Sequence, residues 1–310
     1  MKVAILDDYQ NVAREMADWS PVAERAEITV FSDHVSDADE LVRRLEPFDV
    51  VFVMRERTPL TAEILQRLPR LRMIASTGPF NASIDTEAAQ RLGIHIGTTG
   101  GSASSTVELT WALILATARN LLGECMSVHG GGWQTSVGQE LEGKVLGVLG
   151  VGRIGSRVAR IGAAFGMRVI AWSPNLTRTA AEAAGAELVD RDTLFRTADV
   201  VTIHLRLSER SRGLVGADEF AAMKPTALLV NTSRGPIVDE DALVSAVRDG
   251  RIAGAGLDVF DVEPLPAQHP LRTLPGVVAT PHIGYVADRP YRIFFRDAVE
   301  AITDWLQSVQ

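Results

Sequence analysis

The fold is decided by the stretch Lys144-Val-Leu-Gly-Val-Leu-Gly-Val-Gly-Arg-Ile-Gly155. Its apolar first half predicts a short buried strand, and apolar residues at helical spacing over 156–165 predict a helix directly afterwards. Gly150 permits a tight turn, Gly152 lets backbone N–H groups approach a phosphate, and Gly155 allows close packing of helix on strand. Such a turn opens a helix whose N-terminus attracts an anion, so we expect it to bind the pyrophosphate of a dinucleotide. The alternative is a βα turn without a ligand. The expected contacts within the stretch are its three glycines, Arg153 and Ile154.

The second strand of a dinucleotide-binding fold usually ends in an acid that holds the ribose hydroxyls. Here the strand expected at 168–172 is followed by Ser173, which cannot repel a 2′-phosphate as a carboxylate would. Arg178 and Arg206 could bind that phosphate, or they could be ordinary solvated loop residues. The sequence therefore predicts NAD or NADP as the cofactor without choosing between them.

Length and composition restrict the class of protein. A chain of 310 residues is expected to form two domains. The net charge of −8 and the absence of a dense Lys/Arg block argue against a nucleic-acid partner. Without an apolar run of about 18 residues or a secretory leader pattern, we expect a cytoplasmic protein with no membrane partner. No metal site is expected, and the single cysteine, Cys125, is predicted to be a small buried residue near a helix end.

Short apolar runs alternate with helical periods along the first hundred residues, which predicts a parallel sheet with helices on its faces. The expected strands are 3–6, 28–31, 50–54, 71–75 and 94–96, and the expected helices are 39–45, 61–68 and 85–92. Asp85 is a predicted N-cap, and Gly93 fits the C′ position of the same helix. The first turn, Asp7-Asp8-Tyr9, is acidic where a phosphate loop would need to attract an anion.

The second half repeats this pattern after an apolar helix expected at 106–122, long enough to link two domains. Its further strands are expected at 168–172, 200–205, 227–231, 254–258 and 277–280. A helix at 240–248 has Asp239 as its predicted N-cap and Gly250 after its last turn. The terminal segment 291–306 is expected to be a helix that docks through an apolar face.

Three polar motifs end strands of the second half or follow them directly, at the sheet edge where α/β proteins bind ligands. They are Asn231-Thr-Ser-Arg-Gly235, Gly256-Leu-Asp-Val-Phe-Asp-Val-Glu-Pro264 and Thr280-Pro-His-Ile-Gly284. Taken singly, Arg234 could be a surface cation, Glu263 a carboxylate before a turn proline, and His282 a loop histidine. Their occurrence together with the glycine turn, at successive strand ends, favours an active site.

The four motifs in this order resemble those of the D-isomer-specific 2-hydroxyacid dehydrogenase family, which includes phosphoglycerate dehydrogenases and glyoxylate–hydroxypyruvate reductases. The resemblance extends along the chain, because Ser76-Thr-Gly-Pro-Phe-Asn-Ala-Ser-Ile-Asp85 is similar to the family's substrate loop and Thr106-Val-Glu-Leu to the start of its interdomain helix. It implies an α/β fold in which a Rossmann-type doubly wound domain, residues 101–284, is inserted into a smaller flavodoxin-like catalytic domain. Residues 1–100 and 285–310 would form that substrate domain.

The resemblance also implies a chemistry: NAD(P)-dependent interconversion of a D-2-hydroxy acid and its 2-oxo acid. Arg234 matches the arginine that binds the carboxylate and carbonyl, which its planar fork suits. His282 matches the general acid–base, and Glu263 matches its partner, since a nearby carboxylate favours the imidazolium.

The remaining matches concern cofactor and substrate contacts. Asp258 resembles the residue that orients the nicotinamide amide, with Thr232 and Thr106 lining the same face. Backbone amides near Thr77 and Gly78 would hold the substrate carboxylate, and Arg55 is a second expected substrate contact.

Some residues depart from the family pattern. Ser173 replaces a common aspartate, and Arg206 replaces the proline that usually follows two residues after the histidine at His204. Glu263, where formate dehydrogenases have glutamine, argues against that branch.

The resemblance further suggests a homodimer formed through the cofactor domains, with the region 130–133 near the interface. A different class of function stays open from the sequence, namely a dinucleotide-sensing binding protein of the same fold with little turnover. Intact Arg234, Glu263 and His282 favour the enzyme, because a sensor needs no acid–base pair.

Overall fold

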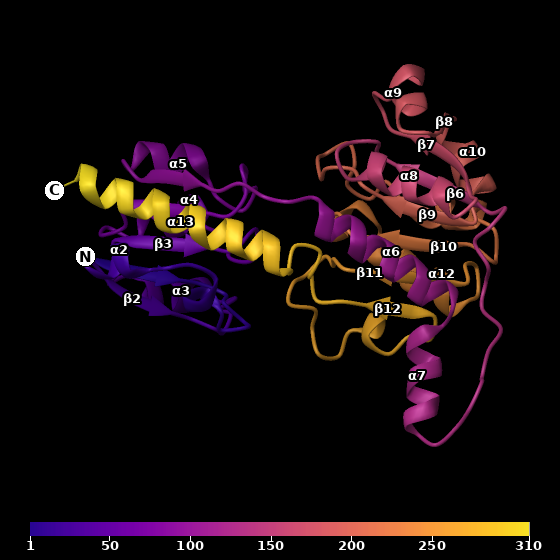
Figure 1. Cartoon of the computed structure of the whole chain (residues 1–310), viewed down its shortest axis with the longest axis horizontal. Helices are drawn as coiled ribbons and strands as arrows, with labels where there is room; N and C mark the ends of the chain where they lie inside the picture. The colour runs from indigo at the N-terminus through magenta and orange to yellow at the C-terminus, as the bar shows by residue number, and fades with distance from the viewer. Residues whose placement is uncertain (310) are drawn as a thin grey trace. The chain divides into compact units, whose positions relative to one another are not determined.

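A computed structural model describes residues 1–309 of the chain, which form two compact α/β units. The smaller unit comprises Met1–Ser102 and the residues from Ala287 onward, and the larger comprises Ala103–Val286 (Figure 1). Each unit has its own parallel sheet and its own hydrophobic core. The predicted α/β class with two parallel sheets is confirmed.

The smaller unit is built on a five-stranded parallel sheet with the order β2-β1-β3-β4-β5. Its strands are β1 (Lys2–Ile5), β2 (Glu27–Val30), β3 (Val50–Val53), β4 (Met73–Ser76) and β5 (His95–Thr98). All five were predicted, with ends shifted by at most two residues. This is the flavodoxin-like order, in which the chain direction across the sheet changes between β1 and β3, and ligands bind at such a point.

Six helices belong to this unit: α1 (Ala13–Met16), α2 (Ser20–Ala23), α3 (Ala38–Leu45), α4 (Ala62–Gln66), α5 (Thr86–Arg91) and α13 (Asp288–Ser308). Asp85 caps α5 by accepting a hydrogen bond from the Ala88 amide at 2.8 Å, and Gly93 has φ +71°, so both predicted caps are confirmed. The terminal helix α13 packs on α1, α2, β4 and β5. Its buried Phe295 stacks on Phe52 of β3 at a centroid distance of 5.2 Å, which confirms the predicted docked helix.

The larger unit contains a seven-stranded parallel sheet with the order β12-β11-β10-β9-β6-β7-β8. The strands are β6 (Val145–Leu149), β7 (Arg168–Trp172), β8 (Glu187–Leu188), β9 (Val200–Ile203), β10 (Leu228–Asn231), β11 (Gly254–Leu257) and β12 (Val277–Ala279). Only the two-residue edge strand β8 was not predicted. The chain direction reverses between β6 and β9, which is the doubly wound arrangement of dinucleotide-binding domains.

Helices cover both faces of this sheet: α6 (Ser104–Ala118), α8 (Gly155–Ala164), α9 (Arg178–Ala183), α10 (Arg191–Thr197), α11 (Ala217–Ala222) and α12 (Glu240–Arg248), with the short 3-10 turns η1 (Gly235–Ile237) and η2 (Pro270–Arg272). Helix α7 (Leu121–His129) follows α6 and does not lie on the sheet. Asp239 caps α12 as predicted, through the Ala242 amide at 3.0 Å. The sheet is therefore sandwiched, and its carboxyl edge is free to carry loops.

Two predictions around residue 120 were wrong. The helix expected to run unbroken over 106–122 ends at Ala118, and Asn120 adopts a left-handed conformation with φ +47° before α7 begins. Asparagine tolerates this conformation better than most residues, so the chain can turn there. Cys125, expected to be buried, is exposed, because α7 buries none of its residues despite its apolar sequence.

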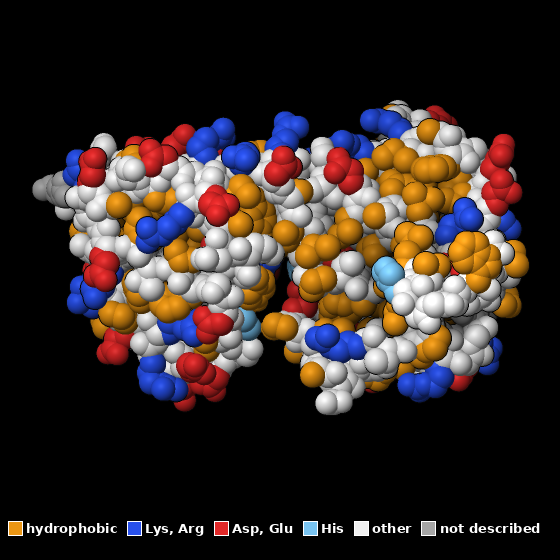
Figure 2. Space-filling view, turned by 60° about the horizontal axis from the view of Figure 1, so that its bottom comes forward, with side chains coloured by type: hydrophobic (Ala, Val, Ile, Leu, Met, Phe, Trp, Pro, Cys, Tyr) orange, Lys and Arg blue, Asp and Glu red, His pale blue; other side chains and the backbone are white. Residues whose placement is uncertain are grey.

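Positively and negatively charged side chains are mixed on the surface of the described residues. On the face drawn in Figure 2, Lys and Arg side chains are interspersed with Asp and Glu, so neither sign of charge dominates there. Within residues 1–309, we find no helix that combines the length and the apolar composition needed to cross a bilayer.

Candidate active site

The glycine turn between β6 and α8 has the backbone geometry that its sequence predicts. Gly150 has φ +96°, and a Cβ there would lie 2.9 Å from the carbonyl oxygen of His204. A Cβ on Gly155 would lie 2.0 Å from the Gly150 carbonyl oxygen, so only glycine allows the helix to start this close to the strand. Around Gly152, in contrast, no protein atom lies within 4 Å of the Cβ position. The predicted tight turn and close packing are confirmed.

The space beside Gly152 and the N-terminus of α8 fit a pyrophosphate. The N-cap residue Ile154 provides no side-chain hydrogen bond to the first turn, so the amides there are not capped by the protein's own side chains. A helix N-terminus in this condition binds anions through its N–H groups and its dipole. The residues present therefore fit a nicotinamide dinucleotide, and the contacts of Arg153 and Ile154 with it stay predictions.

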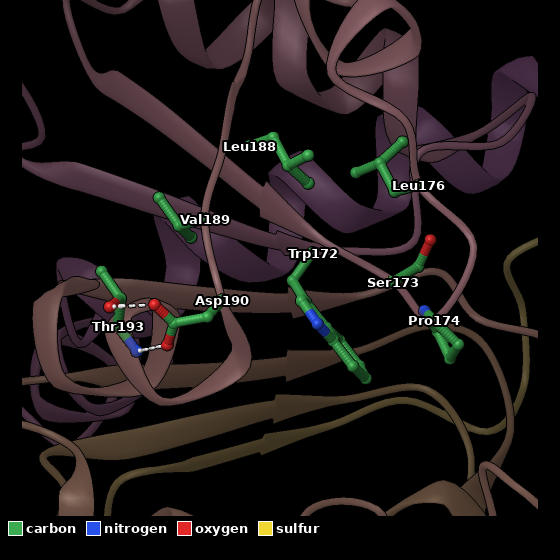
Figure 3. Close-up of a pocket in the computed structure, with 8 residues that line it drawn as sticks. All are labelled: Trp172, Ser173, Pro174, Leu176, Leu188, Val189, Asp190 and Thr193. Atoms are coloured by element: carbon green, nitrogen blue, oxygen red, sulfur yellow. Dashed lines mark hydrogen bonds between the residues drawn. The ribbon is translucent and has the colours of Figure 1, made fainter.

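Ser173 lies at the end of β7 beside an open cavity of about 550 Å³. The residues lining it, drawn in Figure 3, are Trp172, Ser173, Pro174, Leu176, Leu188, Val189, Asp190 and Thr193. Asp190 is the charged residue in this lining, and hydrogen bonds from the amide and hydroxyl of Thr193 lower the pKa of its carboxyl. Neither Arg178, which begins α9, nor Arg206 is among the lining residues.

His204 supports the glycine turn from the neighbouring strand end. Its amide donates to the Leu149 carbonyl at 2.8 Å, and its ring Nε2 lies 3.0 Å from the Thr202 hydroxyl. Burial of the ring lowers the pKa of His204 to about 3, so the imidazole is neutral. The sequence does not reveal this role of His204, because its support of Gly150 depends on two strands, β6 and β9, that are adjacent in space but not in sequence.

His282 and Glu263 form a pair in the loops that follow β12 and β11. Nδ1 of His282 lies 2.5 Å from Oε2 of Glu263, while the other carboxylate oxygen, Oε1, accepts from the Phe260 amide at 3.0 Å. An ionised carboxylate can only accept, so Nδ1 carries the shared proton and Nε2 is the ring nitrogen left for other chemistry. The side chains are 19% and 33% exposed, which leaves the pair accessible.

The Arg234 loop packs directly against the loop that carries Glu263. A Cβ on Gly235 would lie 2.0 Å from the carbonyl carbon of Phe260, so a side chain at this position would separate the two loops. Asn231 braces the turn, because its amide donates to the Arg234 carbonyl at 2.9 Å and its oxygen accepts from the Ser233 amide at 3.0 Å. The sequence did not reveal the role of Gly235, although a glycine directly after the arginine was the available signal.

Asp258 is 1% exposed and hydrogen-bonds on both sides of His282. Its Oδ1 accepts from the Thr280 hydroxyl at 2.6 Å and the Ile283 amide at 2.8 Å, and its Oδ2 accepts from the Gly284 amide at 2.8 Å. Burial raises the pKa of the Asp258 carboxyl, although these hydrogen bonds oppose the shift. Sequence reasoning assigned Asp258 only to the nicotinamide amide and missed its tie to the histidine loop.

The two predicted threonines lie in the same region of the larger unit. The Thr106 hydroxyl donates to the Gly284 carbonyl at 3.0 Å, which places α6 against the histidine loop. The hydroxyls of Thr110 and Thr232 are 2.8 Å apart and are buried. The larger unit therefore brings together Arg234, Glu263, His282, Asp258, Thr106 and Thr232.

The smaller unit brings Arg55, Thr77 and Gly78 together. The Arg55 amide donates to the Thr77 hydroxyl at 2.7 Å, and its guanidinium Nη1 donates to the Thr77 carbonyl at 3.2 Å. The amides expected to bind a carboxylate are already used, however. Thr77 N–H donates to the Val53 carbonyl at 3.2 Å, and Gly78 N–H donates to the Thr99 hydroxyl at 2.8 Å. A carboxylate would have to displace these acceptors, because β3 and the residue after β5, on either side of β4, satisfy the two amides.

The chain is similar to several known proteins. Residues 111–284 match the family model described as the NAD binding domain of D-isomer specific 2-hydroxyacid dehydrogenase. The chain is 46% identical over 233 residues to a glyoxylate reductase of Aeropyrum pernix, covering 72% of this chain and 70% of that protein. It is 40% identical over 265 residues to a hydroxypyruvate reductase of Thermotoga maritima, covering 84% and 85%. A crystal structure of a phosphoglycerate oxidoreductase from Vibrio cholerae O395 superposes with a TM-score of 0.94 at 39% identity, covering 99% of both chains.

The chain belongs to the D-isomer specific 2-hydroxyacid dehydrogenase family. It is therefore an NAD(P)-dependent oxidoreductase that acts on the CH–OH group of 2-hydroxy acids, or on the corresponding 2-oxo acids in the reverse direction. The comparisons support this catalytic function and not the alternative of a dinucleotide sensor without turnover.

Proposed function

We propose that His282 is the general acid–base of this oxidoreductase, oriented by Glu263, and that Arg234 binds the substrate. The observation that carries the proposal is the 2.5 Å contact between His282 Nδ1 and Glu263 Oε2. It fixes the ring so that Nε2 is the atom that gives a proton to the carbonyl oxygen during reduction and takes one from the hydroxyl during oxidation. The Phe260 amide holds Glu263 in place for this task.

Arg234 supplies the anchor for the substrate. Its guanidinium presents parallel donors that match a carboxylate, and it also polarises an adjacent carbonyl oxygen. The Asn231 brace and the close packing at Gly235 keep the backbone at Arg234 next to the Glu263 loop. The arrangement supplies both the charge and the proton donor that a 2-oxo acid needs.

The turn at Gly150, Gly152 and Gly155 would hold the pyrophosphate of NAD or NADP, with Ser173 at the adenosine ribose. Bound there, the cofactor would supply or accept the hydride. The nicotinamide side would be lined by Asp258, Thr106 and Thr232. The Asp258 carboxylate already accepts hydrogen bonds from the loop that carries His282, so it could accept one from the cofactor only through its remaining lone pairs. Arg178 and Arg206 stay candidates for a 2′-phosphate.

We assign residues 1–100 and 285–310 as the substrate domain and residues 101–284 as the dinucleotide-binding domain, which also carries Arg234. The compact units Met1–Ser102 with Ala287 onward and Ala103–Val286 support this assignment. Arg55, with Thr77 and Gly78, is proposed to meet the substrate carboxylate. The names of the relatives make glyoxylate and hydroxypyruvate the first substrates to test.

A homodimer is proposed through the larger unit. Helix α7 and the segment after it expose apolar side chains that a monomer would leave in water, including Leu121, Leu122, Met126, Val128, Trp133 and Val137. Glu124 holds the two parts of this arm together by accepting from the amide and hydroxyl of Thr135 and the hydroxyl of Ser136. Exposed apolar surface on an ordered arm is typical of an interface. A cytoplasmic location stays a prediction.

The decisive experiment follows the nicotinamide absorbance of NADH and NADPH with a panel of 2-oxo acids. Reduction of glyoxylate or hydroxypyruvate that is lost in His282→Ala, while cofactor binding is retained, would support the assignment. Unchanged turnover in His282→Ala would remove His282 from the mechanism. Light scattering that shows a monomer at assay concentration would contradict the proposed dimer.

A further inference from the structure

We propose that Glu240, the first residue of α12, is a positioning residue for the proton transfer. It acts by fixing the loop that carries Glu263, without touching the substrate or the cofactor itself. The inference rests on the proposed roles of Glu263 and His282, and it adds a residue from a different element of the larger unit.

The loop that carries Glu263 has no regular structure of its own, because residues 258–269 form neither helix nor strand. Within this loop, the Phe260 amide donates to Oε1 of Glu263 at 3.0 Å. The hydrogen bond joins two residues of one turn, so it fixes the glutamate relative to the turn and not relative to the sheet. The position of the Glu263 carboxylate therefore depends on what holds the turn to the rest of the unit.

Glu240 supplies such an anchor through the next amide of the turn. The amide of Asp261, directly after Phe260, donates to Oε2 of Glu240 at 3.2 Å. Successive amides of the turn thus bind two different glutamates, one inside the loop and one at the start of a helix. Because α12 buries Leu243 and Val247 in the core, the contact connects the turn to a rigid part of the unit.

The other oxygen of Glu240 holds the far end of the same loop. Nε2 of His269 lies 3.0 Å from Oε1 of Glu240, and the Leu271 amide donates to Nδ1 of the same ring at 3.3 Å. Because Nδ1 accepts a hydrogen bond, Nε2 carries the ring proton and donates it to the carboxylate. A single carboxylate therefore holds the loop on both sides of Glu263.

The backbone of Asp261, and not its side chain, makes the contact with Glu240. Burial raises the pKa of the Asp261 carboxyl and the nearby Glu240 carboxylate raises it further, whereas Arg212 lowers it. Two neighbouring carboxylates repel each other, so the attraction on Glu240 comes from the Asp261 amide, from His269 and from the N-terminus of α12, which favours a negative charge. The Glu240 side chain is 18% exposed, which limits competition from water.

The contact between Glu263 Oε2 and His282 Nδ1, at 2.5 Å, is sensitive to any shift of the turn. Without Glu240, the Asp261 amide and the His269 ring lose their acceptor, and the turn can move relative to the histidine loop. Small displacements of reacting groups are costly in rate, whereas they need not alter how tightly the substrate binds. Loss of Glu240 is therefore expected to lower kcat and to leave KM largely unchanged.

The test is a double-mutant cycle on Glu240 and Glu263, with hydroxypyruvate as substrate. Glu240→Ala should lower kcat by about tenfold, while KM and the Kd for NADH change by less than about twofold. In the Glu263→Ala background the same substitution should lower kcat by less than about twofold, since the residue through which Glu240 acts is already absent. Glu240→Gln keeps one oxygen for the Asp261 amide and should recover part of kcat, and it serves in the cycle if Glu240→Ala does not fold.

Glu219→Ala is the matched control, because Glu219 lies in the first turn of α11 and has a comparable pair of partners. Its Oε2 accepts from the Gly216 amide at 3.0 Å, and its Oε1 lies 3.1 Å from Nη2 of Arg191. This variant should leave kcat unchanged even if its thermal midpoint falls as much as that of Glu240→Ala. His269→Ala should also keep most of kcat, because Glu240 still accepts from the Asp261 amide.

An equal loss of kcat on Glu240→Ala with and without the Glu263 side chain would overturn the inference, because the effect would not pass through Glu263. A normal kcat in Glu240→Ala, a higher KM at unchanged kcat, or an equal loss in Glu219→Ala would overturn it as well. A wild type that reduces no 2-oxo acid, or a normal kcat in Glu263→Ala, would instead be a failure of the proposed function.

Discussion

Asp258 holds the backbone on both sides of His282, through the Thr280 hydroxyl before it and the Ile283 and Gly284 amides after it. His282 itself has φ +53°, a conformation that is costly for a residue with a side chain. The buried carboxylate of Asp258 therefore keeps His282, the proposed acid–base, in a geometry that the chain alone would not favour.

Asp258→Asn is expected to lower kcat by about tenfold to a hundredfold, because the amide cannot accept all three hydrogen bonds and the histidine loop relaxes. Cofactor Kd, measured by protein fluorescence, should change less than kcat. A variant with normal kcat would show that His282 does not depend on this tie.

The free energy of unfolding should depend on pH because of the same residue, Asp258. The folded state raises the pKa of Asp258, so ionisation of this group costs stability: its contribution is most favourable below the unfolded value of 3.8 and declines as pH rises through the folded pKa. The unfolding free energy of the wild type minus that of Asp258→Asn should fall over this range. Denaturant titrations at several pH values measure it, and a difference that rises with pH would contradict the assignment.

His282→Ala should lower kcat by about a hundredfold to ten-thousandfold, the usual loss when a general acid–base is removed. Glu263→Gln should lose less, since the amide keeps the size of the side chain but not its charge. His269→Ala is the matched control, because His269 also pairs with a glutamate in the same unit, 3.0 Å from Glu240. Steady-state kinetics on the three variants should separate His282 and Glu263 from His269.

Arg234→Lys should lower kcat/KM for 2-oxo acids by about tenfold to a hundredfold, because a point charge cannot reproduce the parallel donors of the guanidinium. Arg272→Lys changes another arginine of the same unit, which donates to the Leu265 and Pro266 carbonyls, and should leave kcat/KM unaltered. Equal effects in both variants would argue against a substrate contact at Arg234.

Two alanine substitutions in the glycine turn should affect different properties, cofactor binding in one case and thermal stability in the other. Gly152→Ala meets no protein atom within 4 Å, so the protein should keep its thermal midpoint but bind NADH about tenfold or more weakly. Gly155→Ala places a Cβ 2.0 Å from the Gly150 carbonyl oxygen and should lower the thermal midpoint itself. Calorimetry combined with NADH titration distinguishes the two variants. Tight NADH binding by Gly152→Ala would show that the pyrophosphate does not bind at this turn.

Ser173→Asp tests cofactor choice. A carboxylate at the end of β7 should repel a 2′-phosphate, so the ratio of kcat/KM for NADPH to that for NADH should fall by about tenfold. An unchanged ratio would place the 2′-position of the cofactor away from Ser173.

Much of the fold could be predicted because strands and helix caps depend on residues that are close together in the sequence. Strand cores such as Val50–Val53 are continuous apolar runs, and caps such as Asp85 and Asp239 act on residues three positions away. The site motifs were also visible, since Arg234, Glu263 and His282 follow strands that end at one edge of one sheet.

The errors concern properties that depend on distant partners. Cys125 was expected to be buried because α7 is apolar, but burial requires a surface to pack against, and the described chain supplies none for that helix. The amides of Thr77 and Gly78 donate to Val53 and Thr99, partners that the local sequence does not identify. The hydrogen bond between Asp258 and Gly284 joins residues 26 positions apart, so no local sequence pattern predicts it.

The contact between Gly235 and Phe260 couples the two loops that carry Arg234 and Glu263. A substitution that shifted the arginine outward, to admit a larger substrate, would push the Phe260 backbone and disturb the amide that orients the glutamate. Arg234 and Glu263 should therefore respond together to a substitution in either of these two loops.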